Sequence, residues 1–117
     1  MPARAASTGT GAAASAEPAP VTSLVEIIVD EELTAEAVRR LDGKLGDALR
    51  LHPTHLVVDL TRCGYADAMA IDVLLHAHRR IWQVGGRLTL RGPSPRVQRM
   101  LELARVQQVF HVVPVAS

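Results

Sequence analysis

The sequence predicts a single α/β domain whose mainly parallel sheet is covered by helices. Short apolar runs rich in β-branched residues alternate with amphipathic segments from Leu24 onward, in the order β, α, β, α, β, α, β. The connections are only a few residues long, and a chain of 117 residues has room for one small domain and a tail. Because alternating strands and helices form parallel sheets through right-handed crossovers, we expect one sheet with its helices packed on it.

The first half of the domain is predicted to contain two strands and the helix between them. The run LVEIIVD, residues 24–30, is short, β-branched and bounded by acids, which is typical of a buried strand. A helix over about 34–50 follows, because apolar residues repeat at helical spacing at Val38, Leu41, Leu45 and Leu49. Pro53 ends this region, and HLVVDL, residues 55–60, is apolar on both faces, as a central parallel strand should be.

The next helix and strand are predicted from a cap, an apolar face and a glycine pair. Asp67 stands where a helix N-cap belongs. The expected buried face of the helix comprises Ile71, Leu74, Leu75, His78, Ile81 and Trp82. Gly85 and Gly86 end the helix, and RLTL, residues 87–90, is expected to form the third strand.

The last part of the chain is predicted to form a helix and an edge element. Ser94 is a suitable N-cap, and Pro95 suits the first helical position. The apolar stripe of this helix comprises Val97, Met100, Leu101 and Ala104. The segment VFHVVPV, residues 109–115, is interpreted as an edge element because Pro114 cannot donate to a central ladder.

Residues 1–20 are predicted to be a disordered tail, and residues 21–117 the folded domain. The tail, MPARAASTGTGAAASAEPAP, has almost no large apolar side chain and cannot offset the entropy lost on ordering. Cys63 is the sole cysteine, which excludes an intramolecular disulfide and suits a reducing compartment. We therefore expect a cytoplasmic protein.

Composition disfavours nucleic acid and the bilayer interior as partners. The 13 basic and 12 acidic residues are spread along the chain with no run that would bind a polyanion, so we expect no nucleic-acid partner. Aromatic residues make up only 3% of the chain, too few for a base-stacking platform. No apolar run approaches the roughly 18 residues of a membrane span, so we expect no direct membrane insertion.

The sequence has no recognisable pattern of catalytic, cofactor-binding or metal-binding residues. Neither GxGxxG nor GxxxxGK[ST] occurs, and no serine lies in a GxSxG elbow, so we expect no cofactor. His76 and His78 are two apart on a predicted helix and point to different faces, so we expect no metal. Cys63 has no predicted basic partner and is interpreted as a small buried residue.

One acidic constellation offers a weaker alternative. Asp30 and Glu31 follow the first strand, and Asp59 lies near the end of the second, as in the acid pocket of a phospho-accepting receiver domain. Such a domain also needs a lysine late in the chain, whereas Lys44, the only lysine, lies on the first predicted helix. Asp59 is therefore interpreted as a strand-end or turn residue.

A series of motifs points to a family: VVDL at 57–60, Asp67 at a helix start, GGRLTL at 85–90 and PSPRVQRMLEL at 93–103. With this frame, the span from about Leu24 to Val113 resembles the STAS domain, the family of bacterial anti-sigma factor antagonists and related modules. The resemblance implies a four- or five-stranded mixed sheet with helices packed on it and a non-enzymatic role. Such antagonists dock on an anti-sigma factor that is also a kinase, until the kinase phosphorylates the serine of a D-S-[ST]-G motif at the helix start.

The departures from the family motif fall on this switch. Matched residue by residue, Ala68 stands at the phosphorylated serine and Met69 at the next hydroxyl residue. Ala70 stands at the motif glycine, and Asp72 stands where a small residue is common. At the end of the last helix, Arg105 replaces the usual glycine. Because Ala68 has no oxygen, it cannot accept a phosphoryl group.

Two interpretations of this helix start stay open. Ala68 and Met69 are either a docking surface fixed in the unphosphorylated, binding-competent state or part of a decayed or repurposed domain. Asp67 is either only a cap or a cap that also contacts a partner. Asp72 lies one turn after Ala68, within about 6 Å of where a phosphate would be, and is either a solvated charge or a weak mimic of phosphorylation.

We therefore expect a non-catalytic protein-interaction module that regulates a sigma factor, and so transcription. It would bind a GHKL-type anti-sigma factor kinase without being phosphorylatable at the usual site, and the expected partner-binding residues are Asp67, Ala68, Met69 and Asp72. The alternative is a STAS-like accessory subunit of a membrane transporter or lipid-trafficking ATPase. An enzyme acting through Asp59 or Asp67 is a third hypothesis.

Overall fold

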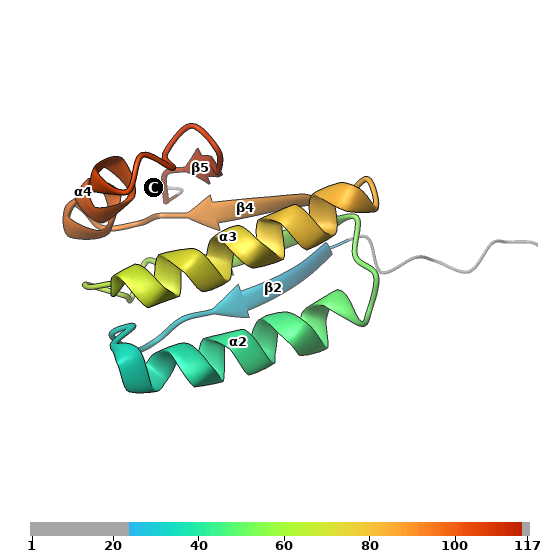
Figure 1. The fold of residues 1–117 in the computed structure, drawn as a ribbon, viewed down its shortest axis with the longest axis horizontal. Helices are drawn as coiled ribbons and strands as arrows, with labels where there is room; N and C mark the ends of the chain where they lie inside the picture. Colours follow the sequence, from blue (N-terminus) through green and yellow to red (C-terminus); the bar gives the residue numbers. More distant parts are fainter. Residues whose placement is uncertain (1–23, 116–117) are drawn as a thin grey trace, which may run out of the picture.

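In a computed structural model that describes residues 24–115, the described strands form one parallel sheet in the order β2-β3-β4-β5 (Figure 1). The strands are β2 (Leu24–Ile28), β3 (His55–Asp59), β4 (Arg87–Arg91) and β5 (His111–Val113). The connecting helices are α2 (Ala35–Leu49), α3 (Ala68–Gln83) and α4 (Pro95–Leu103). This confirms the predicted α/β fold with four strands, whereas the predicted tail, residues 1–20, lies outside the described residues.

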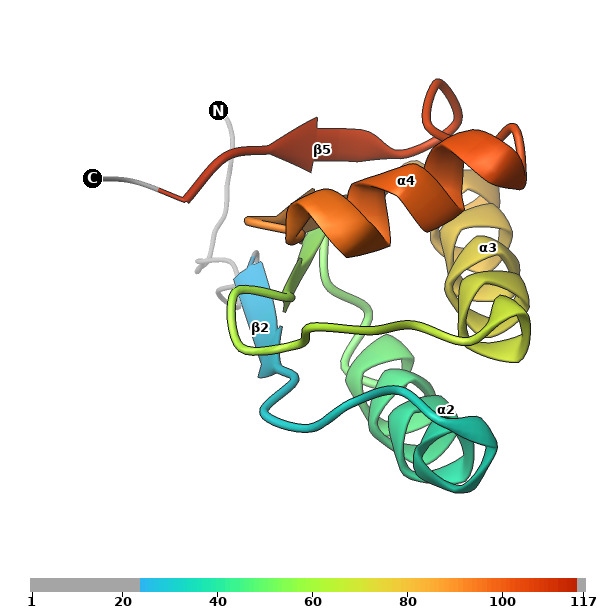
Figure 2. The same ribbon diagram turned by 90° about the vertical axis from the view of Figure 1, so that its left-hand side faces the viewer.

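The sheet has one face covered by helices. Leu24 pairs with His55 and His55 with Arg87, so alternate residues of neighbouring strands share a face. Figure 2 shows α2 and α3 on the same side of the sheet, as right-handed crossovers between successive neighbouring strands require. The strand residues on that side are all apolar: Val25, Ile27, Leu56, Val58, Leu88, Leu90 and Val112.

The helices begin at the residues that the sequence predicts. The Asp67 and Ser94 side chains each accept a hydrogen bond from a backbone N–H in the first turn of the helix that follows. At the end of α4, Arg105 adopts φ 60°, a left-handed conformation that glycine adopts without strain. Glycine, which the resemblance implies at this position, would adopt this conformation without strain.

The prediction that Trp82 lies on the buried face of α3 is wrong. The buried residues of α3 are Ala70, Ile71, Leu74, Ala77 and Ile81. Ile81 takes the inward position of the last turn, and Trp82 lies about 100° further round the helix, where its side chain is 64% exposed.

Within the part of the chain that the structure describes, no helix is both long enough and apolar enough to cross a bilayer.

Candidate functional site

The loop that leads into α3 is held by the connection between β2 and α2. Leu33 and Ala66 form an isolated parallel bridge, in which the Leu33 N–H donates to Tyr65 O at 2.8 Å and the Asp67 N–H donates to Leu33 O at 2.8 Å. The Glu32 carboxylate accepts a further bond from the Gly64 N–H at 2.7 Å. These bonds fix the entry of the chain into α3.

Asp67 caps the helix that this loop presents. Its backbone is extended, with φ −68° and ψ 157°, and its Oδ1 accepts a hydrogen bond from the Met69 N–H at 3.0 Å. Its carbonyl oxygen accepts bonds from the N–H groups of Ala70 and Ile71 at 2.9 and 3.2 Å. The side chain therefore satisfies one of the N–H groups that a helix N-terminus leaves without an intrahelical partner.

All four predicted partner-binding residues lie at the start of α3. Ala68, Met69 and Asp72 are exposed, with Met69 at 56%, and Asp67 is half-buried. Ala70 is fully buried and anchors this turn to the core. The surface consists of a methyl group and a thioether beside two carboxylates, so its side chains offer contacts with another surface but no nucleophile.

A ring and a guanidinium beside this surface were not predicted from the sequence. The Arg96 guanidinium of α4 lies 5.0 Å from the centroid of the Tyr65 ring, within the range of a cation–π contact. No local pattern indicates this pair, because it depends on how α4 lies against the loop before α3. A motif search in the sequence cannot find this pair without the three-dimensional fold.

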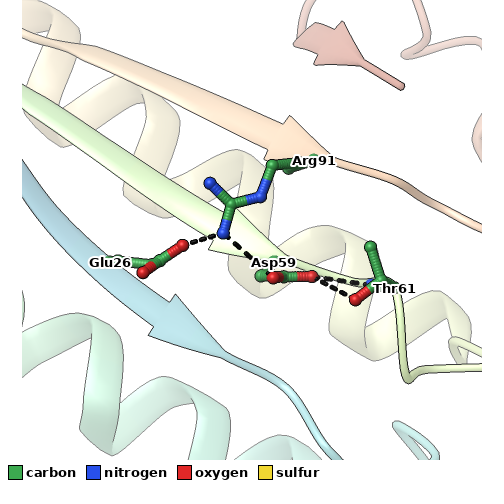
Figure 3. Close-up of polar contacts among 4 residues, drawn as sticks. All are labelled: Glu26, Asp59, Thr61 and Arg91. Atoms are coloured by element: carbon green, nitrogen blue, oxygen red, sulfur yellow. Dashed lines mark hydrogen bonds and ion pairs between the residues drawn. The ribbon is translucent and has the colours of Figure 1, made fainter. Parts of the chain in front are cut away.

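The acid pocket of the receiver-like alternative does not form. Asp59 Oδ1 accepts bonds from the backbone N–H and the hydroxyl of Thr61, at 2.9 and 2.6 Å, and Asp59 Oδ2 accepts from Arg91 Nη2 at 2.9 Å (Figure 3). The same guanidinium pairs with Glu26. Glu31 is bound instead to Arg40, which holds the pKa of that carboxyl below its usual range. Asp59 is thus a strand-end residue, as predicted.

The remaining candidate groups are also accounted for by structure. Cys63 is 1% exposed, and burial raises the pKa of its thiol, so the prediction of a buried cysteine is confirmed. The Thr89 hydroxyl joins His55 Nε2, at 2.7 Å, to His111 Nδ1, at 2.9 Å. Among residues 24–115, no group of three His, Cys, Asp or Glu side chains could hold a metal ion.

Comparison with known proteins agrees with the fold. The family model described as "Mlab, STAS domain" matches residues 21–114, and the chain belongs to this family of STAS domains. STAS domains are in general non-catalytic interaction modules. A comparison with curated proteins gives no match.

Solved structures of anti-sigma factor antagonists share the fold. A putative anti-sigma factor antagonist from Thermotoga maritima, TM1081, is 18% identical in its crystal structure, with a TM-score of 0.71 over 81% of this chain and 82% of that one. The anti-sigma factor antagonist SpoIIAA in its unphosphorylated form is 23% identical, with a TM-score of 0.63 over 86% of each chain.

Proposed function

We propose that this STAS domain is an anti-sigma factor antagonist-like module that docks on an anti-sigma factor kinase through the start of α3 and is not switched at position 68. The observation that carries this proposal is Ala68, an exposed methyl group at the first position of a capped helix, where the family motif has its serine. The domain would act in the cytoplasm and regulate transcription through the sigma factor that its partner holds.

The physical basis is the charge that a phosphate would bring to this surface. Phosphorylation adds about −1.5 to −2 charges at pH 7, and a helix N-terminus accommodates such a charge well. The same charge would enter any interface formed there and end the docking. Without a hydroxyl at Ala68, the surface keeps its apolar, binding-competent form whatever the activity of the kinase.

The exposure of Met69 supports a working surface over a decayed one. An exposed thioether contributes nothing to the core, whereas a flexible and polarisable side chain adapts well to a partner's surface. Asp67 and Asp72 flank it and would complement basic residues of a partner. In this proposal Asp72 is an interfacial charge rather than a mimic of phosphate.

The proposal is tested by incubating the full chain with its cognate anti-sigma kinase and ATP. We expect a complex, and an intact mass without added phosphate at the start of α3. The matched variant Ala68→Ser should bind, gain one phosphoryl group and then release the kinase, because only the acceptor oxygen is restored. A phosphopeptide from the start of α3 in the unmodified sequence, or a kinase that binds neither chain, contradicts the proposal.

A docking variant locates the surface. Met69→Gln should weaken the complex by about tenfold, since the few residues that anchor the centre of an interface each cost more than about 1 kcal/mol when they are replaced. Leu103→Gln is the control, because Leu103 is also an exposed apolar side chain, at 68%, but ends a different helix. Equal losses in the two variants would place the interface elsewhere.

The alternative, an accessory subunit of a membrane transporter or lipid-trafficking ATPase, is also supported by Ala68. A subunit that stays bound needs no phosphoacceptor, so the loss of the acceptor serine would not impair its function. Capture of the full chain from cells followed by mass spectrometry distinguishes the two roles. The antagonist role predicts a small GHKL-type kinase in the captured material, and the subunit role predicts an ABC-type ATPase.

A further inference from the structure

The end of the domain opposite the docking surface carries exposed apolar side chains. Trp82 is 64% exposed, Val84 73% and Leu51 56%, and all three lie where α3 and α2 end, at the amino ends of the strands. We call these residues, together with His52, Arg80 and Arg87, the Trp82 surface. Large apolar side chains that are exposed together in one region of a small domain indicate a binding surface.

The apolar and basic residues of this surface adjoin one another. His52, Arg80 and Val84 line one hollow, together with Leu49 and Gln83. Trp82 and Arg87 line a second hollow with His78 and Val109. Arg80 and Trp82 lie two residues apart, so the two hollows border the last turn of α3 from its two flanks, whereas Leu51 lines a third hollow with Lys44 and Asp47.

The Trp82 ring is supported from one side. His78 lies one turn earlier in α3, with its ring centroid 5.9 Å from that of Trp82, and Phe110 packs edge-on against His78 at 5.8 Å. The indole is thereby held outward by a half-buried and a buried ring. A ring presented in this way has an apolar body and one N–H donor, which suits the boundary between water and lipid.

The basic charges of the Trp82 surface have no acidic partners. Arg80 and Arg87 lie in a stretch, from Asp72 to Glu102, that contains no other acid, and Asp47, the acid near this end of α2, is paired with Arg50. Within residues 24–115, Arg80 and Arg87 form no ion pair, whereas Arg40, Arg50 and Arg91 are all paired with carboxylates. The local charge is therefore positive although the net charge of the chain is only +1.

From these observations we propose that the Trp82 surface binds the surface of an anionic lipid bilayer. Arginine side chains extend their apolar stems along lipid while their charges reach the headgroups, and tryptophan and valine enter the interface between them. A nucleic acid would leave the exposed Val84 and Leu51 without contacts. A second copy of the chain would bring arginine against arginine across a two-fold axis.

This surface is independent of the proposed docking function. It lies at the C-terminal end of α3, and a rise of about 1.5 Å per residue from Ala68 to Trp82 places it about 21 Å from Ala68. A domain bound to lipid through Trp82 would therefore present the start of α3 to the solution. Failure of one proposal leaves the other intact.

The test uses the full chain and the fluorescence of Trp82, its only tryptophan. Vesicles of phosphatidylglycerol and phosphatidylcholine in equal parts should shift the emission to shorter wavelength, and lipids brominated on the acyl chain should quench it. Vesicles of phosphatidylcholine alone should cause neither effect. Raising the salt to about 1 M, where the Debye length is about 3 Å, should release the protein.

Matched charge variants locate the binding. Arg80→Gln with Arg87→Gln should weaken partitioning by about 30-fold, because each arginine near an anionic surface contributes about 1 kcal/mol. The control, Arg39→Gln with Arg99→Gln, removes the same charge from exposed positions on α2 and α4 and should change partitioning by less than about threefold. Val84→Ser, which keeps the tryptophan, should reduce both the affinity and the shift. Far-ultraviolet circular dichroism checks that each variant is folded.

Three results would overturn the proposal. The first is an emission that does not change with anionic vesicles or changes equally with neutral ones. The second is an equal loss of partitioning in the two double variants. The third is a shift that develops with protein concentration in the absence of lipid, which would identify a second copy of this chain as the occupant.

Discussion

Two substitutions distinguish a capping role of Asp67 from a role in partner binding. Asp67→Ala removes the oxygen that accepts the Met69 N–H, at 3.0 Å, and leaves that donor at the helix start without its protein partner. The loss of a cap costs about 1 kcal/mol, and the loss of a negative charge at a helix N-terminus about 0.5 kcal/mol more. We therefore expect Asp67→Ala to lower the free energy of unfolding by about 1.5 kcal/mol.

Asp67→Asn keeps an oxygen in the same place and loses only the charge. It should lower the free energy of unfolding by about 0.5 kcal/mol, because asparagine caps helices as well as aspartate does. For a domain of this size, the melting temperature should fall by about 8 °C in the alanine variant and by about 3 °C in the asparagine variant. Urea unfolding is best followed by far-ultraviolet circular dichroism, since the exposed Trp82 ring reports poorly on the core.

The comparison also tests the role of Asp67 in docking. If Asp67 is only a cap, the asparagine variant binds the partner with unchanged affinity; if its charge contacts the partner, binding weakens although the helix start is intact. Equal destabilisation by asparagine and alanine would refute the capping role, because the geometry of the acceptor would then not matter. The binding result thus shows whether Asp67 is only a cap or a cap that also contacts the partner.

Four further predictions concern packing, pH and reactivity. Gly86→Ala should destabilise by about 1–3 kcal/mol, because an added methyl would lie 2.6 Å from a carbon of a buried isoleucine. Gly43→Ala, where a methyl meets nothing within 4 Å, should stabilise by about 1 kcal/mol in the same urea titration. Burial lowers the pKa of His55 and His78 in the folded chain, so the unfolded chain binds protons more readily. The free energy of unfolding should therefore fall as the pH drops below about 6.5. His55→Gln should flatten that dependence in urea titrations over the pH range. Cys63 should react with iodoacetamide much more slowly in the folded chain than in urea, and equal rates in mass spectra would contradict its burial.

Local sequence patterns account well for the elements of the fold. The predicted helix over 34–50 and the strand over 55–60 correspond to α2 and β3 within a residue at each end, because apolar spacing and the capping positions are local properties. Ser94 and Pro95 likewise begin α4 as predicted. Side-chain periodicity failed at Trp82, which lies beside the inward position taken by Ile81, and at Ala104, which is exposed just after the end of α4.

Contacts between distant segments could not be predicted in this way. The bridge between Leu33 and Ala66 and the bond from the Gly64 N–H to Glu32 join loops whose proximity depends on the parallel pairing of β2 with β3. The Trp82 surface is similar, since Arg80 and His52 adjoin only after α2 and α3 pack together. A chain whose charges appear evenly spread in sequence thus has one end that is basic.

The parallel sheet explains why two separate surfaces can lie on one helix. In a β-α-β unit the helix begins at the carboxyl ends of the strands and returns to their amino ends, so the two ends of α3 open on opposite ends of the domain. Between Ala68 and Trp82, the inward face of α3 is buried in the core and its two ends share no surface side chain. Substitutions at Arg80 and Arg87 should therefore leave partner binding at Ala68 unchanged, and Met69→Gln should leave lipid binding unchanged. A partner assembled at the bilayer would have to reach about 21 Å past the lipid-bound end to contact Ala68, whereas a kinase in solution meets Ala68 directly. Lipid binding at the Trp82 surface would thus favour a partner that approaches from solution.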